Sequence, residues 1–363
     1  MSQFHSLRVA AKNPETNRAI TLQLALTPEL AQAFSYIPGQ HVVLRAFIGG
    51  QEVRRTYSIC AGSDAGRLGL CIRSDSPGRM TAYLCDQLQV GTEIDAFPPT
   101  GRFGVPANSN GVNFLAVAAG IGITPVLSIL SGILSSQPRA RVTLMYCNRD
   151  TDSVLFAEAL QGLKDRYLSR FSLHFFMSRE SQEIELYNGR IDKDKVRETA
   201  ALAFDPTVID AVFICAPEAM MIEVGAALRE LGIAQARIHL ERFVTGSAQG
   251  HEEPAAKTAA APAKSASEST AAVSVKMDGR VRSFRMPRDG SVSVLDAAEI
   301  AGIDLPYSCK GGVCSTCRTH LARGSVHMNL NYALEDSEVE AGFVLTCQAV
   351  PTSAEIELDY DTR

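Results

Sequence analysis

The sequence predicts a multidomain protein: an antiparallel β-barrel, then an α/β domain built on a parallel sheet, then a small α+β domain. Three observations predict this order. Short alternating segments fill residues 1–107, apolar strands alternate with helical segments over residues 108–244, and a Cys-rich segment with mixed strand and helix patterns covers residues 272–363. The length of 363 residues agrees with two to three domains of ordinary size.

The first domain is predicted from short runs of alternating apolar and polar residues, such as AITLQLAL, QHVVLRAFI and RLGLCIR. Turn residues such as Pro38-Gly39 and Gly49-Gly50 separate these runs. Short strands bounded by turns are typical of antiparallel barrels and sandwiches. The second domain is predicted from the apolar runs VNFLAVAAG, RVTLMYC, FSLHFFM and AVFICAP, which alternate with segments of helical spacing. That alternation favours a parallel sheet.

Residues 245–271 predict a flexible linker before the third domain. They contain nine Ala and no Leu, Ile, Val or aromatic residue, so they bury too little apolar surface to offset ordering entropy. One long helix is the alternative, because Ala is the best helix former, but Pro254 and Pro262 argue against it.

Composition limits the classes of partner. Lys and Arg number 35 against 40 Asp and Glu, a net charge of −5, so we expect no nucleic-acid partner. The apolar stretch at 114–130 is interrupted by Gly120, Gly122 and Pro125, so we expect no membrane span. No secretory signal is visible, and we expect a cytoplasmic protein whose nine cysteines are thiols or metal ligands.

Four of the cysteines have the spacing of metal ligands. Cys309, Cys314 and Cys317 form C-x4-C-x2-C, and Cys347 follows after 29 intervening residues. This is the spacing of a plant-type [2Fe–2S] ferredoxin. Gly311 and Gly312 allow backbone N–H groups to approach the cluster. Zinc is the alternative, but structural zinc sites usually combine two short Cys pairs, whereas Cys347 is alone.

Four further motifs precede the linker: Arg55-Thr56-Tyr57-Ser58, Gly78-Arg79-Met80-Thr81, Gly120-Ile121-Gly122-Ile123-Thr124-Pro125 and Cys215-Ala216-Pro217. Together with the cysteines, they resemble the ferredoxin–NADP reductase superfamily with a plant-type ferredoxin domain fused at the C-terminus. Oxygenase reductase components have this organisation. Ala216 departs from the family's C-G-P. The resemblance implies an FAD-binding barrel, an NAD(P)-binding α/β domain and a β-grasp ferredoxin domain.

The resemblance implies FAD-binding residues in the barrel. Arg55 offers planar donors to the pyrophosphate, Tyr57 lies against the isoalloxazine ring, and Ser58 donates to flavin N5. Alternatively, Arg55 is a solvated strand residue and Tyr57 a core aromatic. A helix whose N-terminal amides hold flavin phosphate begins at the turn that contains Gly78, Met80 and Thr81. An ordinary helix N-terminus is the alternative.

The resemblance also implies nicotinamide-nucleotide residues in the second domain. Gly120 and Gly122 permit close backbone approach to the nucleotide, Thr124 lies near the nicotinamide and ribose, and Cys215 belongs to the motif beside the nicotinamide. A structural strand-to-helix turn is the alternative for the glycines. In the HLERF segment, Glu241 relays a proton or orients the nicotinamide, and Phe243 covers the flavin ring. An edge-strand charge and a core Phe are the alternatives.

The choice of nucleotide depends on residues after two strands. Arg149 is a cation after the second strand of this domain, and Ser178 and Arg179, after the third strand, resemble the S-R pair that holds the 2′-phosphate of NADPH in the family. Ordinary surface arginines are the alternative. Asp150 and Asp152 lie nearby in the sequence and favour NADH instead, because NAD sites often carry an acid for the ribose. We expect NADPH.

The implied function is that of a reductase that takes hydride from NADPH onto FAD and passes single electrons through the cluster to an aromatic or steroid oxygenase component. The third domain carries an acidic excess that includes Glu335, Asp336, Glu338, Glu340 and Glu355, which suits a docking face for a basic partner. An ordinary solvated face is the alternative and the more common explanation of such charges. Two alternatives are a stand-alone NAD(P)H oxidase or dye reductase with a regulatory ferredoxin domain, and a redox sensor with a structural metal.

Overall fold

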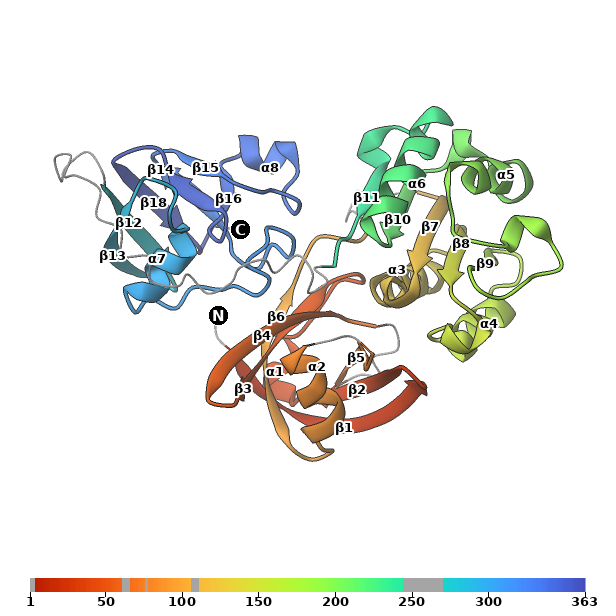
Figure 1. Ribbon diagram of the computed structural model, residues 1–363, viewed down its shortest axis with the longest axis horizontal. Coiled ribbons are helices and arrows are strands. Elements are labelled where there is room, and N and C mark those ends of the chain that lie inside the picture. The colour runs from red at the N-terminus through yellow and green to blue at the C-terminus, as the bar shows by residue number, and fades with distance from the viewer. Residues whose placement is uncertain (1–3, 61–65, 76–77, 106–110, 244–269, 363) are drawn as a thin grey trace. The chain divides into compact units, whose positions relative to one another are not determined.

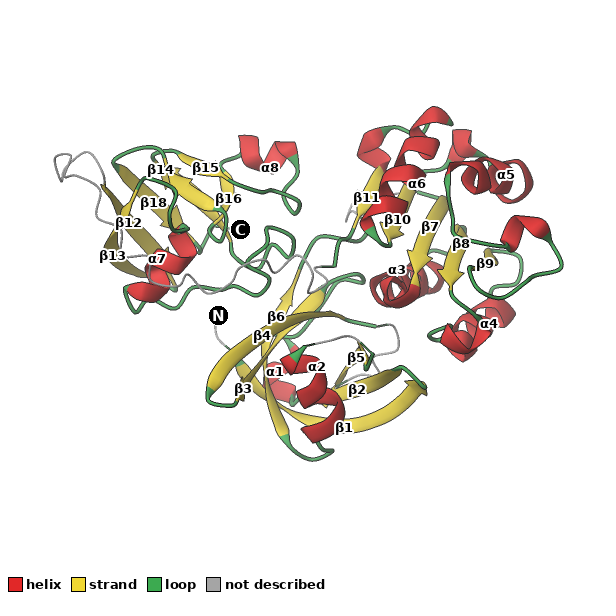
Figure 2. Cartoon of the chain, viewed as in Figure 1, coloured by secondary structure: helices red, strands yellow, loops and turns green. Residues whose placement is uncertain are grey.

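The computed structural model describes residues 4–60, 66–75, 78–105, 111–243 and 270–362. Figures 1 and 2 show the helices and strands of these residues. The contacts divide the chain into two compact units. One comprises residues 5–53 and 57–243, and the other comprises the C-terminal residues with a few residues of the N-terminal part. The expected linker, 245–271, lies outside the described residues except for its last two, which begin a strand.

The first sheet is six-stranded and antiparallel, with the order β4-β3-β6-β1-β2-β5. Ile59, directly after β4, forms an antiparallel bridge with Leu70 of β5, so the sheet closes on itself. The predicted antiparallel barrel is therefore confirmed. Two short helices accompany it, and the second continues as a π-helical turn over Tyr83–Gln87. The elements are β1 (His5–Thr16), β2 (Ala19–Ala25), α1 (Pro28–Ala31), β3 (His41–Ile48), β4 (Gln51–Ser58), β5 (Arg67–Arg73), α2 (Arg79–Ala82) and β6 (Glu93–Thr100).

The second sheet is five-stranded and parallel, with the order β11-β10-β7-β8-β9. α3 and α4 contribute to the core on one face, and α5 and α6 to the core on the other. The chain leaves β7 toward β8 and later returns to β10 on its other side, which places a ligand-binding crevice at the carboxyl ends of these strands. The elements are β7 (Asn113–Ala119), α3 (Ile123–Ser136), β8 (Arg141–Asn148), α4 (Ala157–Arg166), β9 (Phe171–Met177), α5 (Lys193–Ala203), β10 (Ala211–Cys215), α6 (Glu218–Glu230) and β11 (Ile238–Leu240).

The barrel and the parallel sheet share one hydrophobic core. Cys60 and Cys71 of the barrel belong to the same buried cluster as Tyr146 of β8. The ring of Phe103 packs edge-on against Phe213, with centroids 5.8 Å apart. Burial of these apolar surfaces fixes the barrel against the nucleotide-side domain.

The third sheet has the order β13-β12-β18-β14-β16, and β12 and β18 are parallel in an otherwise antiparallel arrangement. α7 packs on this sheet through Val294, Leu295 and Ala298. This is the predicted β-grasp fold. The elements are β12 (Thr270–Met277), β13 (Arg280–Pro287), α7 (Val294–Ile300), β14 (Arg318–Arg323), β15 (Val326–Met328), α8 (Asp336–Glu340), β16 (Phe343–Leu345), β17 (Ala349–Pro351) and β18 (Glu355–Asp359).

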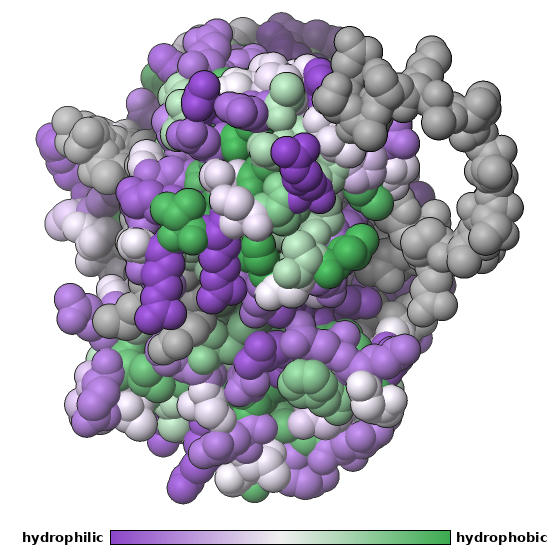
Figure 3. Space-filling view, turned by 90° about the vertical axis from the view of Figure 1, so that its left-hand side faces the viewer, coloured by the Kyte–Doolittle hydropathy of each residue, from purple (hydrophilic) through white to green (hydrophobic). Residues whose placement is uncertain are grey.

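The surface and the cysteines add further findings. Within the described ranges, no helix combines the length and apolar character that a membrane crossing requires. The space-filling view in Figure 3 shows hydrophobic residues interspersed with hydrophilic ones on the face toward the viewer. All nine cysteines are free, which fits their expected state as thiols or metal ligands.

Candidate functional site

Two of the predicted nucleotide motifs meet at the carboxyl edge of the parallel sheet. β10 lies beside β7, with Cys215 opposite Ala118, so the loop after β7 reaches the end of β10. A β-carbon added to Gly122 would lie 2.0 Å from the carbonyl oxygen of Cys215. Only glycine permits this approach. The structure therefore brings Gly122 and Cys215 together, although they lie far apart in the sequence.

Gly120 opens the same loop with φ of +50°, and no atom lies within 4 Å of the position that a β-carbon would occupy. Its carbonyl accepts a 3.0 Å hydrogen bond from the buried Tyr146 hydroxyl. Thr124 is 2% exposed, and its hydroxyl donates to the carbonyl of Ile121 at 2.9 Å. The hydroxyls of Tyr146 and Thr124 thus fix two carbonyl groups of the turn. The space beside the Gly120 α-carbon stays open to a ligand.

Glu241 lies beside Cys215. Its N–H donates to the carbonyl of Ile214 at 3.0 Å and extends the pairing of β11 with β10. Burial raises the pKa of the Glu241 carboxyl to about 8. Burial also raises the pKa of the Cys215 thiol, and the nearby Glu241 charge adds to that effect. Phe243, two residues on, is 37% exposed.

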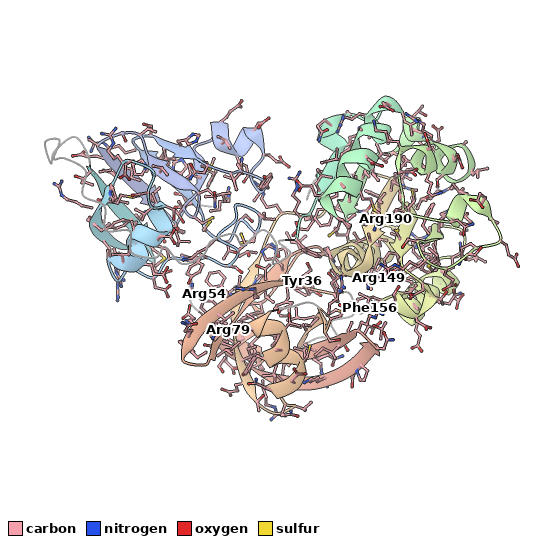
Figure 4. All side chains as sticks on the ribbon, in the orientation of Figure 1. Tyr36, Arg54, Arg79, Arg149, Phe156 and Arg190 are labelled. Atoms are coloured by element: carbon pink, nitrogen blue, oxygen red, sulfur yellow. The ribbon has the colours of Figure 1, made fainter. Side chains whose placement is uncertain are left out.

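Three predicted nucleotide residues gather at the ends of β8 and β9. The N–H of Ser178 donates to the carbonyl of Asn148 at 2.9 Å, and the N–H of Arg179 donates to the carbonyl of Arg149 at 2.7 Å. The Arg149 side chain is 42% exposed and lies 3.9 Å from Asp75 of the barrel loop (Figure 4). Both arginines are thus held on adjacent strand ends.

Two acids of this edge, Asp150 and Glu180, accept hydrogen bonds from the loop that follows β8. Asp150 accepts the N–H of Ser153 at 3.0 Å as a capping box. Glu180 accepts the N–H and the hydroxyl of Thr151, each at 2.7 Å, and these bonds lower the pKa of its carboxyl. Asp152 is exposed. The motifs did not single out Glu180, whose position directly after Arg179 was the only available signal.

The predicted flavin residues lie on β4 and α2. Ser58 ends β4 and is 6% exposed, and Tyr57 packs partly buried against the barrel core. The Arg55 guanidinium donates to the carbonyl of Arg54 at 2.7 Å. Gly78, with φ of +147°, precedes α2, whose Met80 is buried in the core and whose Thr81 is half-buried.

Arg79, which the prediction passed over, joins α2 to the β3–β4 hairpin. Its guanidinium donates to Gln51 Oε1 at 2.6 Å and to the carbonyl of Ile48 (Figure 4). The first-turn amides of a helix lack partners within the helix, so the turn that begins at Gly78 suits a phosphate group.

The four cysteines form two pairs. The thiols of Cys309 and Cys314 interact with each other, as do those of Cys317 and Cys347. The Cys314 thiol and the N–H of Gly311 lower the pKa of Cys309. In the part of the chain that the structure describes, no group of three or more His, Cys, Asp or Glu converges on a single ion. Two thiol pairs fit a cluster in which each of two irons takes two thiolates.

The cysteine loop has an unusual backbone. Lys310 and Ser315 have φ of +49°, and Gly312 has φ of +72°. Such values turn successive N–H groups toward one side of a loop, as in anion-binding concavities. The N–H of Gly311 already donates to Cys309 Sγ at 3.3 Å. The loop therefore supplies both thiolates and amide donors to the sulfur atoms.

Comparisons with known proteins agree with this geometry. Family models match residues 6–104 as an oxidoreductase FAD-binding domain, 116–225 as an oxidoreductase NAD-binding domain and 275–352 as a 2Fe-2S iron-sulfur cluster binding domain. The chain is 38% identical to a component of the 1,2-phenylacetyl-CoA epoxidase of Escherichia coli (strain K12), over 100% of this chain and 99% of the relative. It belongs to the family of flavin and iron–sulfur oxygenase reductases.

Further relatives extend the comparison for this reductase. It is 33% identical to the ferredoxin reductase component of 3-ketosteroid-9-alpha-monooxygenase from Rhodococcus rhodochrous, over 98% of this chain and 96% of the relative. The solved structure of phthalate dioxygenase reductase shares the fold, with a TM-score of 0.57, 24% identity and 98% coverage of both chains. The reductase thus has FAD-binding, NAD-binding and 2Fe–2S domains, and the zinc alternative is not retained.

Two acids of the expected docking face are engaged within the reductase's own third domain. Glu338 is 6% exposed and accepts from Arg318 Nε at 2.9 Å. Glu355 pairs with Arg323 at 3.6 Å. Glu335, Asp336 and Glu340 are exposed on or beside α8. Of the five acids, Glu338 is therefore buried, whereas Glu335, Asp336, Glu340 and Glu355 remain exposed.

Proposed function

We propose that this reductase oxidises NADPH and delivers electrons singly to an oxygenase component. Bound FAD supplies the conversion of a two-electron donor into the one-electron steps that a [2Fe–2S] cluster accepts. One observation supports this proposal above the others: a single chain carries a glycine-lined nucleotide edge, an FAD-binding barrel and paired cluster cysteines. We keep domain boundaries at 1–107, 108–244 and 272–363, with a linker at 245–271, as part of the proposal.

The nucleotide edge positions the nicotinamide. Gly120 leaves room for the pyrophosphate and ribose to approach the backbone, and Gly122 holds the loop against Cys215. Thr124 stabilises the start of α3 behind them. Glu241, with its raised pKa, holds a proton near neutral pH and can donate a hydrogen bond to the ligand beside Cys215. Phe243, which is 37% exposed, would cover the flavin ring when FAD is bound.

The preference for NADPH rests on two cations. Arg179 and Arg149 stand on adjacent strand ends, where their backbones are hydrogen-bonded to each other. Guanidinium groups suit a phosphate better than a ribose diol. Asp150 and Glu180, the acids nearest to these arginines in the sequence, already accept hydrogen bonds from the loop, which leaves them less available to a 2′-hydroxyl.

The barrel residues orient FAD. Ser58 is buried at the end of β4, where its hydroxyl can donate to flavin N5. Tyr57 lies beside it and presents a ring to the isoalloxazine. Arg55 and the turn of Gly78, Met80 and Thr81 hold the phosphates, through guanidinium donors and helix amides respectively.

Cys309, Cys314, Cys317 and Cys347 would hold the cluster, and the amides of Gly311 and Gly312 would stabilise the thiolate charge. The acceptor is an oxygenase of the class that the relatives serve, and phenylacetyl-CoA epoxidase is the one that we propose. We also propose a cytoplasmic location, because the five cysteines outside the cluster set are free thiols, and a thiolate-bound cluster suits a reducing compartment.

An anaerobic NADPH titration followed by absorbance and EPR tests the function. We expect flavin bleaching and then a reduced-cluster EPR signal, and electron transfer to the epoxidase oxygenase that stops in Cys309→Ser. Bleaching without any cluster signal in the wild-type protein would refute the proposal. Oxygen or quinone turnover that survives Cys309→Ser, with no partner reduction in the wild type, would instead support the stand-alone oxidase.

A further inference from the structure

Gln348 follows the fourth cysteine and contacts both ends of the cysteine set. Its side-chain Nε2 donates to the carbonyl of Lys310 at 2.8 Å and contacts Cys347 Sγ at 3.8 Å. An amide NH₂ group has two N–H donors, so both bonds can exist together. Lys310 directly follows Cys309, so one side chain joins the neighbourhoods of the first and fourth cysteines.

The surroundings of Gln348 hold it in this position. The side chain is buried, with 7% of the residue exposed. The backbone N–H of Gln348 donates to the carbonyl of Leu345 at 2.9 Å, and the backbone carbonyl of Gln348 accepts the N–H of Asn329 at 3.0 Å. A β-carbon on Gly312 would lie 3.2 Å from Gln348 Cγ, so the stem of the side chain lies directly against the cysteine loop.

We propose that Gln348 is a positioning residue that sets the reduction potential of the cluster and slows its loss. The proposal rests on the function proposed above, because it requires a [2Fe–2S] cluster on the four cysteines. The N–H of Gly312 and the Gln348 amide both face Cys347 Sγ. Donors to a ligand sulfur stabilise the added negative charge of the reduced cluster and so raise its potential. The bond to Lys310 adds a second effect, since it ties the loop to the fourth ligand.

Three variants of the full-length, cluster-loaded protein test the proposal. Gln348→Met removes both donors at similar side-chain length, and Gln348→Glu keeps the shape but replaces the amide nitrogen by oxygen. Thr346→Val is the matched control, because the Thr346 hydroxyl donates to the Cys317 carbonyl at 3.3 Å and to no sulfur that the structure records. EPR-monitored redox titration gives the potential, resonance Raman gives the Fe–S stretching frequencies, and absorbance in chelator gives the rate of cluster loss.

We expect both Gln348 variants to lower the potential, to shift the Fe–S frequencies and to lose the cluster several-fold faster. We expect Thr346→Val to speed cluster loss without moving the potential or the frequencies. Gln348 variants that behave like Thr346→Val, with faster loss but an unchanged potential and unchanged frequencies, would overturn the proposal. That result differs from a failure of the proposed function, in which the wild-type protein itself would show no reduced-cluster signal.

Discussion

Gly122 packs so closely on the end of β10 that the position of an added β-carbon lies 2.0 Å from the Cys215 carbonyl oxygen. The contact closes the nucleotide loop, because it joins the segment after β7 to the segment after β10. The nearest atoms to that position are the Cys215 backbone oxygen and carbon, at 2.0 and 2.8 Å, and the Cys215 sulfur lies farther away at 3.2 Å. The relationship is one of backbone against backbone, and it determines which substitutions the loop tolerates.

We expect Gly122→Ala to separate the two segments, because backbone cannot move away as a flexible side chain can. The loss of stability should be on the order of 1–3 kcal/mol, as for overpacked sites, and the affinity for NADP⁺ should fall at least tenfold. Gly162→Ala in α4 is the control, since no atom lies within 4 Å of its added carbon. Calorimetry and NADP⁺ titration measure both effects. Unchanged NADP⁺ affinity in Gly122→Ala would contradict the role of the contact.

Glu241 predicts a pH dependence of stability. Its pKa is about 8 in the folded chain and about 4.3 in an unfolded one, so the folded state binds the proton more tightly. The stabilisation is complete below the unfolded pKa and is lost as pH rises through about 8. Glu241→Gln should flatten this decline between pH 5 and pH 8, roughly the window that the two pKa values define. Thermal melts of the wild-type and Glu241→Gln proteins at each pH measure the effect. The same change of melting temperature with pH in both proteins would contradict the prediction.

The position of Arg179 leads to a prediction about the preference for NADPH over NADH. Arg179→Ala should raise the KM for NADPH about 10- to 100-fold, the range expected for losing a charged hydrogen bond, and should change the KM for NADH little. Arg139→Ala is the control, because Arg139 is exposed and lies before the amino end of β8, whereas Arg179 follows the carboxyl end of β9. Steady-state kinetics with both nucleotides measure the ratio. An equal change for both nucleotides would show that Arg179 does not read the 2′-phosphate.

The remaining acids near α8 predict the salt dependence of electron delivery. Asp336→Asn combined with Glu340→Gln should slow reduction of a basic acceptor, cytochrome c, at low salt and should flatten the decline of the rate with ionic strength. Glu355→Gln combined with Glu357→Gln removes the same charge from side chains paired with Arg323. Stopped-flow rates that respond equally to both pairs would assign the effect to net charge and not to this face.

The domain order was predictable from sequence, because strand periodicity is a local property. The spacing of the four cysteines predicted that they would lie near one another, and the structure brings them together as two pairs. The meeting of Gly122 with Cys215 was predictable only as two separate motifs, since their contact depends on β10 lying beside β7. The number of acids available on the third domain was overestimated. Glu338 shows why: charge is visible in a sequence, whereas its hydrogen bond with Arg318 forms only when β14 and α8 pack.

The shared core of the barrel and the parallel sheet has a consequence for how such a chain can change during evolution. Phe103 and Phe213 belong to one buried cluster, so neither domain keeps a complete interior if the other is removed. The β12–β18 sheet has a separate interior of its own. Gain or loss of the segment that begins at β12 therefore adds or removes a domain together with its own hydrophobic core. A chain break between the barrel and the nucleotide domain would instead expose apolar surface on both.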